Sequence, residues 1–172
     1  MIRNEPGVVE LVVTRHRAVG ARSESVADQP FLFTLFKSVK GPEFALMPVG
    51  EPMRRQLLNM QYHAMITGYR AAFPAARFEV IVLNDEPIGR LITDRNPDWL
   101  HVVYIALLPE WRNRGIGTAV MTAVLDDPRS RGLRCEATLA VDNLPSLRLW
   151  SRLGFVERER NLTDVIVEWR PA

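Results

Sequence analysis

The sequence predicts a mixed α/β (α+β) fold, in which a central, mostly antiparallel sheet of about six or seven strands carries helices on both faces. Runs rich in β-branched and apolar residues alternate with segments whose apolar residues recur at helical spacing. Turn residues separate these runs, and 47% of the 172 residues are apolar. A chain of this length forms one hydrophobic core more readily than two, so we expect a single domain over residues 1–172.

Two apolar runs and a helix open the chain. Residues 8–13 are apolar enough for a strand, and residues 18–25 fit a second one. Asp28-Gln29-Pro30 then predicts the start of a helix, with Asp28 as its N-cap. The expected buried face of this helix is formed by Phe31, Leu35 and Val39.

A loop and a long helix follow. Residues 41–52 are rich in Gly and Pro and predict the loop, and residues 53–73 predict the helix. Residues 78–83 and 88–94 form a hairpin pattern around the turn at 84–87.

Residues 99–107 complete a three-stranded meander. From there the predicted order is a helix, a strand over residues 134–141, a second helix and two final strands.

The most informative segment is the loop Arg112-Asn113-Arg114-Gly115-Ile116-Gly117, which lies between the strand-like residues 101–108 and a predicted helix. A helix start offers backbone N–H groups without intrahelical partners and a partial positive charge, which together favour an anion. The two glycines let a ligand approach the backbone and tolerate positive φ, and the two arginines can bind phosphate oxygens. The segment therefore predicts a pyrophosphate-binding loop.

Two common nucleotide-binding motifs do not fit this loop. The Rossmann pattern requires a third glycine three residues after the second, but Thr118, Ala119 and Val120 follow Gly117. A Walker A loop requires Gly-Lys-Ser/Thr, which occurs nowhere in the chain. For the loop taken alone, an ordinary strand-to-helix turn remains the alternative.

The pattern Arg112-x-x-Gly115-x-Gly117 resembles the acyl-coenzyme A loop of the GNAT-type N-acetyltransferase superfamily, Gln/Arg-x-x-Gly-x-Gly/Ala, which follows the fourth core strand. Downstream, Asn143-Leu-Pro-Ser-Leu-Arg-Leu-Trp-Ser-Arg-Leu-Gly-Phe155 resembles the second signature of the family, Asn-x-x-Ala/Ser-x-x-x-Tyr-x-x-x-Gly-Phe. Two motifs in this order, with a strand-like run between them, are hard to obtain by accident. The resemblance covers about residues 77–169.

The resemblance implies a sheet that splays where the pantetheine arm of acetyl-coenzyme A inserts, between the strand ending near Leu107 and the strand over residues 135–141. Acetyl-coenzyme A is then the co-substrate, and no metal is expected. Asn143 can also cap the following helix, since the two roles are compatible. By position, the residues expected to bind the coenzyme are Ile105, Ala106, Leu107, Arg112, Asn113, Arg114, Gly115, Ile116, Gly117, Thr118, Asn143, Ser146 and Trp150.

The implied chemistry is direct transfer of an acetyl group to a primary amine, which must lose a proton before it attacks. The departing thiolate needs a proton, yet Trp150 stands where many family members have a tyrosine, and an indole N–H is a poor acid. Tyr104 and Ser146 are the candidate catalytic residues, with water or the substrate as alternative proton donors. The candidate bases are Tyr104, Glu79, His101, Glu136 and Asp142.

The acceptor is expected to be a small amine or an amino-acid-like molecule, held under residues 31–73. This segment has few acidic residues beyond Glu43 and Glu51, whereas a polycationic acceptor would favour more. It offers five aromatic residues to a substrate groove: Phe33, Phe36, Phe44, Tyr62 and Tyr69. The missing tyrosine leaves a second class open, a regulatory module that binds acetyl-coenzyme A with little or no turnover.

Charge and composition limit the other partners. The chain has 22 Lys and Arg against 20 Asp and Glu, a small surplus and no basic tail, so no nucleic-acid partner is expected. No apolar run approaches the roughly 18 residues of a membrane span, and the N-terminus has no hydrophobic signal region. We therefore expect a cytoplasmic protein that does not bind membranes.

Three smaller expectations concern single residues and the end of the chain. The only cysteine, Cys135, lies in a predicted strand and should be buried and inert. His16, His63 and His101 share no ligand spacing, so no metal site is expected. The run over residues 165–169 is either an edge strand, through which a homodimer could form, or a covered one.

Overall fold

The computed structural model describes residues 8–14, 17–127 and 132–171, so His16 lies outside the described residues. The strands are β1 (Val8–Thr14), β2 (Arg17–Ser23), β3 (Arg77–Leu83), β4 (Glu86–Arg95), β5 (Trp99–Leu107), β6 (Arg134–Ala140), β7 (Val156–Arg160) and β8 (Asp164–Trp169). The helices are α1 (Gln29–Ala45), α2 (Glu51–Ala72), α3 (Ile116–Asp126) and α4 (Leu144–Arg152), with short 3-10 turns η1 (Val26–Asp28) and η2 (Pro109–Trp111).

A single mixed sheet runs through the described residues in the order β1-β2-β3-β4-β5-β6-β8-β7. Every pair of neighbours is antiparallel except β5 and β6, which are parallel. The predicted mixed and mostly antiparallel sheet is confirmed. It has eight strands among the described residues, against the six or seven expected, because the two N-terminal runs form a hairpin.

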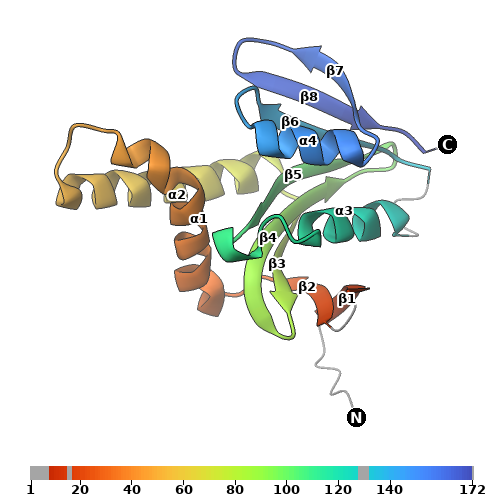
Figure 1. Ribbon diagram of the computed structural model, residues 1–172, viewed down its shortest axis with the longest axis horizontal. Coiled ribbons are helices and arrows are strands. Elements are labelled where there is room, and N and C mark those ends of the chain that lie inside the picture. Colours follow the sequence, from red (N-terminus) through yellow and green to blue (C-terminus); the bar gives the residue numbers. More distant parts are fainter. Residues whose placement is uncertain (1–7, 15–16, 128–131, 172) are drawn as a thin grey trace.

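Helices cover both faces of the sheet, as predicted (Figure 1). On β3, Ile81 and Leu83 pack with α3 and α4 in one core cluster, whereas Val80 and Val82 pack with α1 and α2 in another. This alternation is the two-residue period of a strand that is buried on both sides. The sheet therefore separates an α3/α4 face from an α1/α2 face.

The first helix begins where predicted, with Asp28 as its N-cap residue, but it ends later than predicted. The carboxylate of Asp28 makes no capping hydrogen bond to α1 and instead accepts hydrogen bonds from the backbone N–H and hydroxyl of Ser25 and from Arg22. Residues 41–45, expected in a loop, continue α1 through Pro42. The helix continues because Phe44 is buried between α1 and α2, and this packing outweighs the local Gly-Pro signal.

The terminal strand β8 is covered. It lies between β6 and β7, so the exposed edge beside it is β7. Of the two alternatives for residues 165–169, the structure therefore shows the covered strand. No helix of the described residues is long and apolar enough to cross a membrane.

A bulge in β5 shapes the centre of the sheet. Ile92 of β4 pairs with Tyr104 and Thr93 pairs with Val102, so Val103 is the extra residue. Before the bulge, Val102 faces the α3/α4 core, and after it Leu107 faces the same core. The bulge therefore turns both His101 and Tyr104 toward the α1/α2 face, which explains their ring contacts with Phe73 and Tyr69 of that side.

Candidate active site

The predicted anion loop has the backbone geometry of an anion nest. Asn113 and Gly115 both have positive φ, 57° and 77°, and α3 begins at the next residue, Ile116. Residues of this conformation between extended or helical neighbours turn successive N–H groups toward a common point. The loop is therefore shaped to receive an anion through its main chain.

The start of α3 adds further donors. The N–H of Ala119 makes the first bond of the helix, to the Gly115 carbonyl at 2.9 Å, so the N–H groups of residues 116–118 precede the intrahelical ladder. No side chain of the described residues caps this helix. These donors and the helix dipole favour negative charge at the loop.

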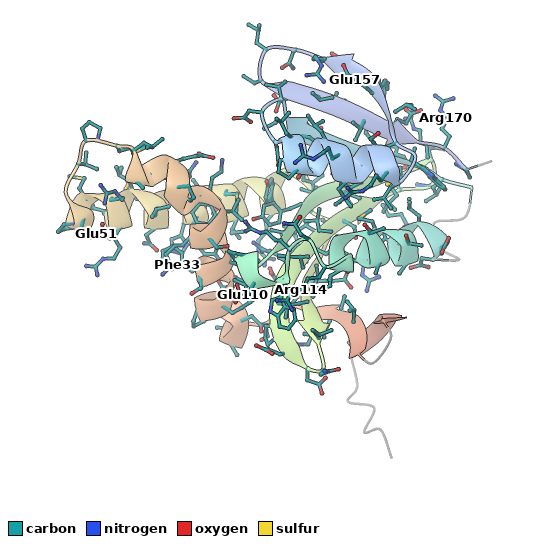
Figure 2. All side chains as sticks on the ribbon, viewed as in Figure 1. Phe33, Glu51, Glu110, Arg114, Glu157 and Arg170 are labelled. Carbon is teal, nitrogen blue, oxygen red and sulfur yellow. The ribbon has the colours of Figure 1, made fainter. Side chains whose placement is uncertain are left out.

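The two arginines of the loop have different surroundings. Nε of Arg112 donates to the Leu107 carbonyl at 2.8 Å, and its Nη2 donates to Ser38 Oγ of α1 at 3.3 Å. Arg112 thus fixes the end of β5 and is directed toward α1. Arg114 is exposed just before α3, and its guanidinium lies 5.1 Å from the centre of the Trp111 ring (Figure 2). Arg114 is the side chain better placed to meet a phosphate.

The sheet splays beside this loop. Strands β5 and β6 pair only from Trp99, opposite Arg134, to Val102, opposite Ala137. Beyond Val102, β5 continues to Leu107 without β6 beside it. Ile105, Ala106 and Leu107, predicted to meet the pantetheine, lie in this part of β5. Their strand neighbour is β4 on one side, and β6 has left the other side. Apart from the Leu107 carbonyl, which accepts from Arg112, the backbone groups on that side of β5 have no strand neighbour among the described residues and can pair with an extended ligand.

The second motif lies next to the first. Asn143 is the N-cap of α4, and its Oδ1 accepts a hydrogen bond from the backbone N–H of Ser146 at 3.3 Å. A Cβ added at Gly117 would lie 3.5 Å from Cδ2 of Leu149, so α4 packs directly against the first turn of α3. The fold therefore brings both predicted motifs to one side of the splayed strands.

Trp150 is part of the core. Its side chain is 1% exposed, and its ring makes an edge-to-face contact with Phe155 at 4.6 Å between centroids. Its buried Nε1–H has no partner among the described residues. This environment fits the expected packing role and gives no path for proton exchange with water.

Tyr104 lies on the opposite face of the sheet from Trp150. The centroid of its ring lies 6.2 Å from the ring centroid of Tyr69 on α2. Burial raises the pKa of Tyr104 to about 12, although the positive charges of Arg90 and Arg112 oppose that shift. Tyr104 is therefore protonated at neutral pH and can donate a hydrogen bond. Ser146, the other candidate, lies in the first turn of α4.

The aromatic residues expected to line a groove are mostly core residues. Phe36, Phe44 and Tyr62 are buried between α1, α2 and β3, and Phe33 packs against them. Tyr69 alone of the five contacts Tyr104. The expectation of a groove lined by all five is therefore wrong, because the helices use these rings to pack on the sheet.

An ion cluster on the α1/α2 face, in which Arg90 and Glu24 are buried and Arg70 is exposed, escaped the sequence prediction. Nη2 of Arg90, in the middle of β4, donates to both carboxylate oxygens of Glu24 at 2.9 and 2.8 Å. Arg70 of α2 donates to the same carboxylate at 2.8 Å, and both guanidinium groups lie over the ring of Phe78. The available signal was a charged residue, Arg90, close to Ile88, Leu91 and Ile92 in the apolar middle of the strand.

The candidate bases differ in their partners. Glu79 is buried and bonded to Arg77 at 2.7 Å, and Glu136 accepts from Arg158 at 2.8 Å. His101 is partly buried, and this burial lowers its pKa despite the nearby carboxylates of Glu136 and Asp94. The described residues contain no group of three His, Cys, Asp or Glu side chains arranged to hold a metal ion. Cys135 is buried as predicted, and burial raises its pKa to about 12.

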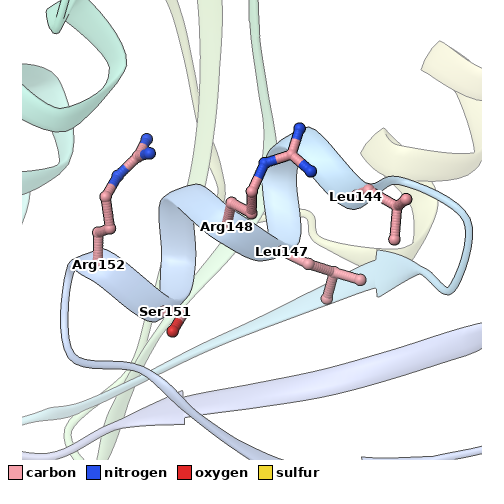
Figure 3. Close-up of a pocket in the computed structure, with 5 residues that line it drawn as sticks. All are labelled: Leu144, Leu147, Arg148, Ser151 and Arg152. Atoms are coloured by element: carbon pink, nitrogen blue, oxygen red, sulfur yellow. The ribbon is translucent and has the colours of Figure 1, made fainter.

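A shallow concavity lies along one face of α4, outside the predicted site. Figure 3 shows its lining side chains, Leu144, Leu147, Arg148, Ser151 and Arg152. The two arginines are one helical turn apart and extend from the same helix face. None of these residues belongs to the predicted coenzyme or catalytic set.

Comparison with known proteins agrees with this geometry. An uncharacterized N-acetyltransferase of Methanocaldococcus jannaschii is 31% identical over 94 residues, which are 48% of this chain and 40% of that protein. The L-amino acid N-acetyltransferase of Escherichia coli is 28% identical over 88 residues, 48% of this chain and 54% of that protein. The chain thus aligns with about half the length of these curated relatives.

The fold has solved counterparts. The PaiA N-acetyltransferase of Thermoplasma acidophilum, determined in complex with coenzyme A, superposes with a TM-score of 0.67 over 89% of this chain and 99% of that one, at 16% identity. The sequence profile of the Acetyltransferase (GNAT) family matches residues 49–155, which include the loop before α3 and the whole of α4. The anion loop, the splayed strands and this match lead to one conclusion: the chain belongs to the GNAT family of acetyltransferases.

Proposed function

We propose that this protein transfers the acetyl group of acetyl-coenzyme A to the primary amine of a small acceptor, by direct attack of the amine on the thioester. The observation that carries the proposal is the loop before α3, where two residues with positive φ and an uncapped helix start lie beside the splayed edge of β5. A ligand with a pyrophosphate and an extended amide-containing arm matches both features.

Residues of this chain would hold the coenzyme at three places. The N–H groups of residues 113–118 and the Arg114 side chain meet the pyrophosphate. The main chain of residues 105–107 pairs with the amides of the pantetheine arm. Asn143 and Ser146, at the start of α4, complete the other side, and Trp150 packs behind them. Bound there, acetyl-coenzyme A supplies an activated acyl group.

The acceptor would bind on the α1/α2 face, where Tyr104 and Tyr69 meet. The neutral Tyr104 hydroxyl donates a hydrogen bond at this position, and the cationic groups of Arg90 and Arg112 act on it electrostatically. A small acceptor with a carboxylate, such as an amino acid, suits a face with this positive charge. The substrate class in the name of the E. coli relative is consistent with this choice.

The proposal is tested by release of free thiol from acetyl-coenzyme A in the presence of single amines. The panel contains the twenty L-amino acids, the decarboxylated amine of each, a polyamine, and a peptide with a free N-terminus and a lysine. We expect turnover with small amines, faster for those with a carboxylate, and an N-acetylated product by mass spectrometry. Turnover of the peptide alone would contradict a small acceptor, and binding without turnover of any amine would indicate a regulatory module.

A further inference from the structure

Three titratable side chains lie in one row at the centre of the sheet, and the row continues to Glu168 of β8, which pairs with Glu136 and lies 3.6 Å from Arg158. Asp94 of β4 pairs with His101 of β5, and His101 pairs with Glu136 of β6. Side chains at paired positions of neighbouring strands point to the same face, and neighbouring strands lie about 4.8 Å apart. Asp94 and Glu136 therefore flank His101 on its two sides.

This row faces α2, away from the α3/α4 core. The neighbours of the row, Leu100 and Val102 on β5 and Cys135 and Ala137 on β6, are all buried in that core. The imidazole of His101 instead packs against two aromatic rings. Its centroid lies 5.2 Å from the ring centroid of Phe73, just after α2, and 5.6 Å from that of Trp99. His101 is thus held on the same face as Tyr104, where the acceptor is proposed to bind.

The row also lies at the vertex of the splay. The rung after His101 and Glu136 is that of Val102 and Ala137, and it is the last one between β5 and β6. The bulge at Val103 then places Tyr104 on the same face as His101. A group that enters between the separating strands therefore arrives beside His101 and Tyr104.

The chemistry of the row suits a proton acceptor for a cationic amine. Partial burial lowers the pKa of His101, so its imidazole is neutral at pH 7 and can accept a proton. The carboxylates of Asp94 and Glu136 attract an ammonium group, with Glu136 also bonded to Arg158 of β7. The contact from the α2 side is the uncharged ring of Phe73.

The other candidate bases are less suited. Glu79 is engaged by Arg77, and a phenol whose pKa is about 12 is protonated and cannot act as the base. Asp142 lies between β6 and α4 and belongs to neither strand of the vertex.

We propose that His101 is the general base of the acetyl transfer, and that Asp94 and Glu136 draw the ammonium form of the acceptor toward it. An unprotonated ring nitrogen of His101 takes one proton from the ammonium group. The amine lone pair then forms the new C–N bond as the C–S bond breaks, and the second amine proton neutralises the leaving thiolate. His101 returns its proton to solvent. This inference rests on the proposed function.

The experiment uses the amino acid that the panel shows to be turned over fastest, with wild type, His101→Gln and the control His63→Gln, whose histidine is exposed on α2. At pH 7 we expect His101→Gln to lower kcat/KM by roughly 100- to 10,000-fold. Its affinity for acetyl-coenzyme A, measured by calorimetry, should stay at the wild-type value. The deficit should shrink toward pH 10, because the amine then loses its proton unaided.

The pH profile distinguishes the outcomes. Wild type and His63→Gln should lose kcat/KM below an apparent pKa under about 6.5, the ordinary histidine value, and His101→Gln should lack this limb. An NMR titration of His101 in wild type should give the same pKa, which tests the assignment even if the variant folds poorly. An unchanged profile in a folded His101→Gln would overturn the role of His101 alone. Wild type that binds acetyl-coenzyme A but acetylates no amine would overturn the proposed function with it.

Discussion

Trp150 is the residue at which this chain departs most clearly from its family pattern. The indole is enclosed in the α3/α4 core, and its N–H has no partner among the described residues. An unpaired buried donor costs stability, so the site retains the ring for its volume and packing against Phe155. In the proposed reaction, the proton for the thiolate then comes from another group.

We therefore predict different effects of Trp150→Phe on stability and on catalysis. Urea unfolding should show a smaller loss than the roughly 3–5 kcal/mol expected for Trp150→Ala, because part of the ring volume remains and an unpaired donor disappears. The kcat of Trp150→Phe should stay close to wild type. A fall in kcat of about 100-fold in a folded variant would instead show that the indole N–H acts in the reaction.

At the scale of elements, the spacing of β4 and β5 depends on Gly89. A Cβ at this position would lie 2.5 Å from the carbonyl oxygen of Ala106 and 2.6 Å from Cδ2 of Leu107. Both atoms belong to the part of β5 that is proposed to bind the pantetheine. The glycine thus allows a close approach of two strands directly beside the coenzyme site.

Gly89→Ala should therefore destabilise the protein by about 1–3 kcal/mol and weaken acetyl-coenzyme A binding, as measured by urea unfolding and calorimetry. The matched control is Gly68→Ala in α2, where a Cβ meets no atom within 4 Å. That change should stabilise the protein by up to about 1 kcal/mol, since alanine is the better helix former. Equal free energies of unfolding for the two variants would show that β4 and β5 can move apart to accept the Cβ with no loss of stability.

The junction between β2 and α1 predicts a pH dependence. Asp28 bonds Arg22 at 2.6 and 2.8 Å and Ser25 at 2.7 and 2.8 Å, and the Arg22 bond is the main reason why its pKa lies well below the ordinary value. Because the pKa is lower in the folded state, this carboxylate stabilises the fold above the unfolded value of about 3.9. That contribution disappears as the pH falls through the folded pKa.

Asp28→Asn should accordingly unfold at lower urea than wild type at pH 7, because a neutral amide pairs less strongly with Arg22. The difference in urea midpoint between the two proteins should narrow as the pH falls from 4 to 2. A difference in urea midpoint that stays constant over this range would show that the charge of the Asp28 carboxylate does not contribute to stability.

At the scale of the whole molecule, the sequence determined the order of elements well. The hairpin, the meander and the strand-to-helix loop have strong local signals, and the structure confirms them. The end of α1 was misplaced because tertiary packing of Phe44 overrides a Gly-Pro signal. The covered position of β8 depends on its pairing with β6, a distant segment, which local patterns do not contain.

The candidate site divides in the same way. Its loop is a contiguous motif, and the sequence located it directly. The row of Asp94, His101 and Glu136 depends on strand register and on a bulge at Val103, neither of which is readable from spacing along the chain. The same is true of Arg90 and Glu24, which are 66 residues apart.

The central claim is that the loop before α3 binds the pyrophosphate of acetyl-coenzyme A. Gly115 has a φ of 77° and open space around its Cα, and Asn and Asp are the side chains that best tolerate this conformation. Gly115→Asn and Gly115→Asp are therefore matched in shape and differ by one negative charge at the proposed anion site.

Calorimetric titration of acetyl-coenzyme A into wild type and these two variants tests the claim most directly. We predict that Gly115→Asp binds at least about tenfold more weakly than Gly115→Asn, a difference of about 1.4 kcal/mol. In thermal unfolding, ligand at 100 times the wild-type Kd should stabilise wild type by about 2.7 kcal/mol, and a Gly115→Asp variant that binds tenfold more weakly than wild type should gain only about 1.4 kcal/mol at the same ligand concentration. Equal affinity of Gly115→Asp and Gly115→Asn would contradict the assignment of this loop to the pyrophosphate.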